Sequence, residues 1–241
     1  TCNHPTFYDF IFRMVFGGGD FVWGKKEVFT RLILREYLTY CVVIPVNSKP
    51  HLAKGEEYTE DIGLLLGKKD REALALDVRK TIGEDCPLDW RIVSAYLVMN
   101  NQTLISYAEG TRVQSYSIKE VKTGAAKVWI DVFGLSGKNV PIVPMFLGYA
   151  KDGKLYLPGK TRPPALGSTV NLTIGEPISL DDILTCPVAL LESKIPLITE
   201  RYRRGIIDCK TKTMMRYCLK EKLTDVSHPP LDEEVGHTRT R

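Results

Sequence analysis

The chain has 241 residues, of which 44% are hydrophobic and 26% charged, and its formal net charge is +4. This composition is ordinary for a globular protein, and the length suits one α/β domain with a single sizeable core. The charge is too small for the dense basic patch of a nucleic-acid-binding protein, but it is compatible with an anionic substrate or membrane surface.

Expected helices and strands alternate along the chain. Periodic apolar positions predict helices, whereas short β-rich or alternating runs predict strands. In chain order, we expect a helix at 5–13, a helix at 25–40, a strand at 41–46, a helix within 59–80, a helix at 90–99, a strand at 103–108, a helix at 118–132, a strand at 140–147, a strand at 169–174 and a basic, mostly helical region at 188–222. This order predicts an α/β sheet with helices on its faces.

The domain organisation follows from where this alternation is interrupted. Residues 1–222 are interpreted as one domain, with a polar insertion at about 50–89, and residues 223–241 as a disordered tail. Because the chain begins at Thr1 and already carries a motif in its first residues, we expect further sequence upstream, where a membrane anchor could lie.

The six cysteines and four histidines bound the chemistry that the chain can carry. The cysteines form no CxxC pair and show no regular spacing, which argues against a disulfide framework or a zinc site and favours a reducing compartment. No apolar run reaches the roughly 18 residues that would span a bilayer. The histidines show no metal-ligand spacing either, so we expect no metal site.

His4 and Asp9 form the first candidate pair. Five residues apart on one helix, they would point in different directions, but Pro5 pushes His4 out of the helical region so that its ring can fold back toward Asp9. A carboxylate that holds one ring nitrogen leaves the other free to accept a proton from an alcohol. The alternative from spacing alone is a histidine that caps a helix and an aspartate that pairs with a surface cation.

The second candidate site is the loop at 109–112. It directly follows a predicted strand, and ligands of α/β sheets bind beyond the carboxyl ends of strands. Gly110 allows close approach of the backbone, Thr111 adds a hydroxyl, and the Arg112 fork suits phosphate oxygens. Glu109 could hold Arg112 in place or accept a hydrogen bond from a substrate hydroxyl. Alone, the loop could equally be a turn with a surface ion pair.

Taken together, these segments resemble the glycerolipid acyltransferase family, which includes lysophosphatidic acid and glycerol-3-phosphate acyltransferases. The similarity runs in the family's order over residues 3–178. Its segments are the NHxxxxD block at 3–9, Tyr-Ala-Glu-Gly-Thr-Arg at 107–112 in place of Phe-Pro-Glu-Gly-Thr-Arg, Lys-Thr-Gly-Ala-Ala at 122–126, Val-Pro-Ile-Val-Pro at 140–144 and Val-Asn-Leu-Thr-Ile-Gly-Glu-Pro-Ile at 170–178. The resemblance implies a single domain built on a mixed, mostly parallel sheet flanked by helices.

The chain departs from the family pattern in two places. An arginine that often follows the second block is replaced by Asn47, Ser48 and Lys49, of which Lys49 could supply a point charge without the bidentate fork. The stretch at 49–90 is also longer than usual. Both departures bear on the identity of the acceptor more than on the type of reaction.

The resemblance implies an O-acyltransferase that needs no cofactor. His4 would act as general base and Asp9 would orient it, while residues 109–112 and Lys49 would bind the acceptor. The donor would be acyl-CoA or an acyl carrier protein, the acceptor a lysophosphatidic acid-type molecule, and the product phosphatidic acid. The family also implies contact with a membrane surface and an active site that faces the cytoplasm, at the endoplasmic reticulum or the bacterial inner membrane; no nucleic-acid partner is expected.

The residues are also compatible with other functions. They are a glycerol-3-phosphate or other lysophospholipid acyltransferase, a thioesterase that uses water as acceptor, and a non-catalytic lipid-binding protein. A serine hydrolase is disfavoured, because the stretch at 134–138 ends in Lys138 where the nucleophile elbow requires glycine. The basic residues Arg201, Arg203, Arg204 and Lys210 could touch anionic headgroups or simply form a solvated helix face.

Overall fold

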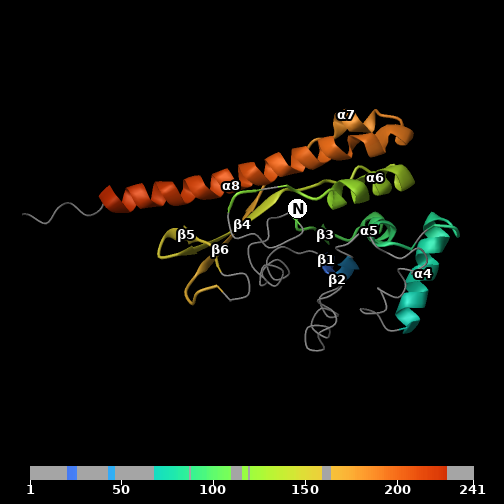
Figure 1. Ribbon diagram of the computed structural model, residues 1–241, viewed down its shortest axis with the longest axis horizontal. Helices are drawn as coiled ribbons and strands as arrows, with labels where there is room; N and C mark the ends of the chain where they lie inside the picture. Colours follow the sequence, from blue (N-terminus) through green and yellow to red (C-terminus); the bar gives the residue numbers. More distant parts are fainter. Residues whose placement is uncertain are drawn as a thin grey trace, which may run out of the picture.

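The computed structural model of the chain describes residues 21–25, 43–46, 68–86, 88–109, 116–118, 120–158 and 164–226. Over these ranges the architecture is mixed α/β, as predicted (Figure 1). The elements in chain order are β1 (Phe21–Lys25), β2 (Val43–Val46), α4 (Lys68–Ile82), α5 (Trp90–Met99), β3 (Leu104–Ile105), α6 (Gly124–Ser136), β4 (Met145–Lys151), β5 (Lys154–Tyr156), β6 (Thr169–Ile174), α7 (Asp181–Leu184), the 3-10 helix η2 (Val188–Lys194) and α8 (Ile195–Val226).

The expectation of a single, mostly parallel sheet is wrong for the described part of the chain. Its strands form two separate three-stranded sheets, one in the order β2-β1-β3 and the other in the order β5-β4-β6. In the first sheet, β1 pairs in parallel with both neighbours. In the second sheet, β4 pairs antiparallel with both β5 and β6. A helical connection can join parallel neighbours, but short turns such as the one after β4 require antiparallel pairing.

The antiparallel sheet begins with a tight hairpin that the sequence expectations missed. Asp152 and Gly153 join β4 to β5 with φ angles of 49° and 77°, which is the left-handed pair that a type I′ turn requires. Strand β5 has only three residues, too few for an alternating pattern to be seen. The strand predicted at 169–174 is confirmed as β6, which pairs with β4 from Met145↔Ile174 to Ala150↔Thr169.

Strand β4 begins later than the strand predicted at 140–147. Pro141 and Pro144 have no backbone N–H, so the chain before Met145 lacks two of the donors that a regular ladder would use. Two of its carbonyls accept hydrogen bonds from the segment after β6. The carbonyl of Ile142 accepts from Ile178 N at 3.0 Å, and that of Pro144 accepts from Gly175 N at 2.9 Å.

Two of the predicted helices are present in the structure, one with the expected bounds and one that starts later. The helix predicted at 90–99 is confirmed as α5, where the Asp89 carboxylate caps the first turn by accepting from Arg91 N and Ile92 N, each at 2.9 Å. The helix predicted at 118–132 starts six residues late, at Gly124, and runs to Ser136. Ile118 and Val121 are buried, but they lie in non-helical chain before α6.

Helix α4 lies within the segment interpreted as an insertion at 50–89. Its Val78 is fully buried, and Leu74 packs with Val93 of α5. This part of the segment therefore contributes to the hydrophobic packing of the domain. The helix expected at 5–13 lies outside the described residues, as does the helix expected at 25–40 except for Lys25, which is the last residue of β1. The strand expected at 41–46 is confirmed from Val43 onward as β2. Of the disordered tail expected at 223–241, residues 223–226 are helical and end α8, and the remainder lies outside the described residues.

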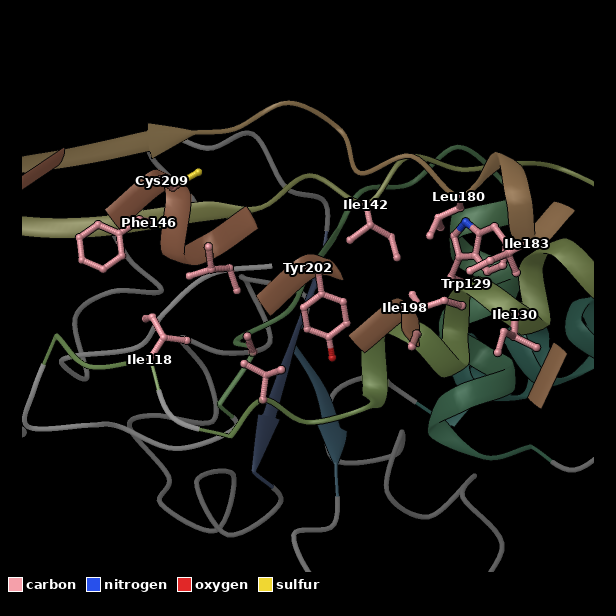
Figure 2. Packing of buried hydrophobic residues seen from close by; sticks show 14 of the residues in the cluster. Ile118, Trp129, Ile130, Ile142, Phe146, Leu180, Ile183, Ile198, Tyr202 and Cys209 are labelled. Carbon is pink, nitrogen blue, oxygen red and sulfur yellow. The ribbon is translucent and has the colours of Figure 1, made fainter. Parts of the chain in front are cut away.

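Helix α8 covers the largest hydrophobic cluster, running above β4 and α6 in Figure 1. It continues to Val226, four residues beyond the predicted end of the helical region at 222. Figure 2 shows Tyr202 pointing from α8 into the middle of this cluster. The fully buried large side chains from α6, β4, α7, η2 and α8 are Trp129, Tyr149, Tyr202, Phe146, Leu147, Ile183, Leu191, Ile198 and Ile206.

An ion-pair cluster joins three helices on one side of this core. Arg91 of α5 forms hydrogen-bonded ion pairs with Asp131 of α6 and Glu192 of η2. The Asp131 side chain is 14% exposed and that of Glu192 is 58% exposed, so the Arg91–Asp131 pair is the buried half of the cluster.

None of the helices in the described ranges has the length and apolarity that a bilayer crossing requires.

Candidate functional site

The candidate site starts at the end of β3, where the chain leaves the parallel sheet. Strand β3 comprises only Leu104 and Ile105, shorter than the strand predicted at 103–108. The next residues nevertheless stay inside the protein, since Ser106 is 5% and Ala108 is 3% exposed. Glu109 follows and is itself only 3% exposed. The first residue of the Glu-Gly-Thr-Arg motif is therefore a buried carboxyl group, and a surface turn does not describe it.

A backbone bridge holds the residue before Glu109. Lys122 N donates to the Ala108 carbonyl at 2.6 Å, and the Lys122 carbonyl in turn accepts a hydrogen bond from the Tyr202 hydroxyl. Tyr202 belongs to α8, about eighty positions further along the chain. The position of Glu109 is thus tied to the last helix through Lys122.

The Tyr202 hydroxyl is suited to remain a donor. Burial raises its pKa to about 12, so it stays protonated across the physiological range. A phenolate at this place would face the Lys122 carbonyl oxygen and would repel it. The neutral hydroxyl is therefore the form that supports the bridge.

A second anchor lies on the far side of the motif, at Tyr116. Its hydroxyl donates to the Tyr156 carbonyl at 2.6 Å and accepts from Tyr149 N at 3.1 Å. These partners belong to β5 and β4, so the chain is fixed to the antiparallel sheet at Tyr116. The chain is therefore anchored to α8, through Lys122, just before Glu109 and to the antiparallel sheet at Tyr116.

The parallel sheet brings the carboxyl ends of β2 and β3 to the same edge. Val22 of β1 pairs with both Val43 and Ile105, so all three strands run in the same direction. The carboxyl ends of β2 and β3 consequently lie at the same edge of the sheet. Lys49 comes three residues after β2, and Glu109 comes four residues after β3.

The structure places one of the predicted site residues, Glu109. The others lie outside the described residues: His4, Asp9, Lys49, Gly110, Thr111 and Arg112. Their predicted roles stay predictions. Two further parts of the motif series lie within the described residues: α6 begins at Gly124 within the 122–126 segment, and β6 ends at Ile174, directly before Gly175, in the 170–178 segment.

Sequence reasoning did not identify Tyr116 or Tyr202 as positioning residues. Tyr202 has a partial signal, because it lies in the buried stripe that also contains Ile198 and Ile206 on α8. Nothing local signals Tyr116, whose partners come from a hairpin more than thirty positions away. A tyrosine in an apolar helical stripe indicates an internal hydrogen bond, because a buried hydroxyl needs a partner.

A groove of about 410 Å³ lies elsewhere on the described surface, between α8 and the loop after β6. Its charged lining residues carry both signs: Arg201, Arg204, Lys212, Glu176 and Asp208. Arg201 is engaged by Asp182 at 2.6 Å, and Arg204 by Glu200 at 3.0 Å. The groove is therefore a salt-bridged surface, separate from the corner at Glu109.

No family model, curated protein or solved structure matches this chain.

Proposed function

We propose that this protein is an O-acyltransferase that moves an acyl group from acyl-CoA or an acyl carrier protein to the hydroxyl of a lysophosphatidic acid-type acceptor. The observation that carries the proposal is the burial of the Glu109 carboxyl group beyond the carboxyl end of a parallel strand. That position combines the Glu-Gly-Thr-Arg motif with the place where α/β sheets bind ligands.

The burial of Glu109 needs a physical reason. Removing a carboxylate from water is expensive by several kcal/mol unless a charge or hydrogen bonds compensate. Glutamate is accordingly among the residues that are least often fully buried. Arg112, three positions later in the motif, is the compensating charge that we propose. In this arrangement Glu109 fixes the guanidinium, which presents its remaining donors to the acceptor phosphate.

The reaction then requires one residue that accepts a proton and later returns it, together with good positioning. His4, oriented by Asp9, removes the proton from the acceptor hydroxyl, whose oxygen attacks the thioester carbonyl carbon. The C–S bond breaks, the thiolate leaves, and the proton held by His4 restores the thiol. Such general-base assistance contributes about 10²- to 10⁴-fold in rate. Holding the two substrates in line supplies a further large share.

The test measures thiol release from acyl-CoA with and without lysophosphatidic acid, together with the formation of phosphatidic acid. The proposal expects thiol release that depends on the acceptor. His4→Ala should lower kcat by about 10²- to 10⁴-fold. Arg112→Ala should raise the KM for the acceptor more than the KM for the donor. Thiol release by wild-type protein without acceptor would instead indicate a thioesterase, and no release with any acceptor would indicate a binding protein.

Matched control variants distinguish the loss of these roles from a general loss of folding. His228→Ala removes a histidine from the tail expected at 223–241, and Arg204→Ala removes an arginine whose side chain is 75% exposed. Both should retain wild-type kinetics. Glu109→Gln keeps the size of the side chain and removes the charge, so it should raise the acceptor KM as Arg112→Ala does. Glu120→Gln, at an exposed position of the same region, is its control.

A further inference from the structure

The second half of α8 has two different faces. Cys209, Thr213 and Tyr217 follow each other at one-turn spacing and are 1%, 1% and 8% exposed. They face the antiparallel sheet, where the Thr213 and Thr173 hydroxyls are hydrogen-bonded at 2.6 Å. This inward face accounts for the packing of the helix. The opposite face is open to solvent in the described structure.

The outward face combines apolar and basic side chains. Met214 is 40% and Met215 is 59% exposed, and Thr211 and Cys218 are exposed beside them. At about 100° per residue, these four positions occupy one arc of the helix. Lys210 borders the arc on one side, and Lys212 and Arg216 border it on the other. Lys212 and Arg216 are exposed, while Lys210 is half-buried.

No acidic residue interrupts this surface along the chain. After Asp208, the next carboxylate in the sequence is Glu221, so residues 209–220 carry only positive charges. The first half of α8 differs, because there Arg201 and Arg204 pair with Asp182 and Glu200. Asp208 lies at the boundary, where it lines the salt-bridged groove together with Glu176. Lys212 lines this groove as well, and from Lys210 to Lys220 the helix itself carries no carboxylate.

We propose that this face of α8, formed by Lys210, Lys212, Met214, Met215 and Arg216, binds the surface of an anionic lipid bilayer. Basic side chains at the borders meet anionic headgroups, while the thioether side chains between them enter the boundary between headgroups and acyl chains. In Figure 1 the final turns of α8 extend past the antiparallel sheet, so the helix can lie flat on a surface there. Two exposed methionines favour a bilayer over nucleic acid, because phosphates and bases offer them no comparable apolar medium. The inference does not depend on the proposed acyl transfer.

The test is co-sedimentation of the full chain with vesicles. One set contains phosphatidylcholine alone, and the other contains equal parts of phosphatidylcholine and phosphatidylglycerol. Binding to the second set only, weakened by added salt, is expected. Each basic residue near such a surface contributes about fivefold in partitioning, so Lys212→Glu with Arg216→Glu should reduce binding by about 25-fold or more. Met214→Ser with Met215→Ser should also reduce binding at unchanged charge.

The matched control is Arg79→Glu with Lys80→Glu, at two exposed positions in the last turn of α4. Each reversal removes two charges, so both double variants lower the formal net charge from +4 to zero. The control should bind like the wild type. An equal loss in the control would overturn the proposal, because net charge alone would then explain binding. Equal binding to neutral vesicles would also overturn the proposal. The same holds for tighter binding of an oligonucleotide through these residues, and for a dimer that dissociates when Met214 and Met215 are replaced.

Discussion

The Cα of Gly205 on α8 lies directly against the ring of Pro144. A β-carbon at position 205 would be 2.6 Å from Pro144 Cγ and 2.8 Å from Pro144 Cβ, closer than such atoms approach in proteins. Gly175 makes a similar contact, since a β-carbon there would be 2.8 Å from Cys209 Sγ. Two glycines therefore allow α8 to pack onto the chain that enters β4 and leaves β6.

Gly205→Ala should destabilise the protein even though alanine favours helices. The Pro144 ring is rigid, so α8 must shift away from it, and such overpacking typically costs about 1 to 3 kcal/mol. Gly134→Ala is the control, because it is also inside a helix but its nearest new contact, with Val188, is an ordinary 3.7 Å. It should stabilise by about 0.5 to 1 kcal/mol. Urea unfolding followed by circular dichroism measures both changes, and effects of the same sign would contradict this account.

Tyr202→Phe should change how stability depends on alkaline pH. The folded-state pKa of about 12 exceeds the ordinary value of 10.0, so stability is fully present below pH 10 and is lost as the pH rises toward 12. For a shift of this size the loss is about 2 to 3 kcal/mol. At pH 7 the variant lacks one hydrogen bond and should be about 1 kcal/mol less stable than wild type.

The quantity to compare is the difference in the free energy of unfolding between wild type and Tyr202→Phe. It should shrink from pH 10 upward, because only the wild type has this buried phenol to ionise. Urea unfolding at intervals between pH 7 and pH 12 gives the two curves. A difference that stays constant over this range would show that the burial of the Tyr202 hydroxyl does not control the alkaline loss of stability.

Removal of Arg91 should destabilise the protein more than removal of an exposed arginine. Arg91→Leu leaves Asp131, whose side chain is 14% exposed, without the guanidinium that contacts it. The expected loss is about 1 to 3 kcal/mol. Arg204→Ala breaks an exposed pair with Glu200 and should cost no more than about 0.5 kcal/mol. Thermal unfolding at low and high salt compares them, and equal losses would argue against a special role for the Arg91 cluster.

Tyr116→Phe tests the anchor that follows the candidate site. The variant leaves the N–H of buried Tyr149 without the hydroxyl that accepts its hydrogen bond, which should cost about 1 to 3 kcal/mol. Hydrogen exchange at Tyr149 should accelerate in step with that loss. If acyl transfer is also correct, the KM for the acceptor should rise more than the KM for the donor. Unchanged stability and exchange would mean that Tyr116 does not hold the chain at this point.

The sequence predicted elements whose pattern is local and complete. Helix α5 has its cap at Asp89 and its apolar positions in one stretch, and β6 alternates over its full length, so both were located correctly. Strand β4 was shifted because hydropathy does not register the missing N–H groups of Pro141 and Pro144. Strands β1 and β5 were missed, since β1 continues into a helix-like pattern and β5 is only three residues long.

In the candidate site, too, the contiguous motif was predicted and the long-range contacts were not. Glu109 was predicted because its motif is contiguous in the sequence, and the structure adds that its side chain is buried. Tyr116 and Tyr202 were not predicted, because each acts through a backbone group brought close only by folding. The separation of the strands into two sheets is also a long-range property, which strand propensity does not encode.

The two sheets also differ in how much chain must be gathered to form them. The β4–β5 hairpin closes a two-residue turn, whereas pairing Val22 with Ile105 brings together residues 83 positions apart (105 − 22). Loop closure over such a distance slows strand pairing, so we expect the hairpin to form early and the parallel sheet late. The edge that carries Glu109 is then completed only after the antiparallel sheet and α8 already offer a surface to dock on. Slow refolding would therefore first be seen as delayed burial of Glu109, with the C-terminal half already structured.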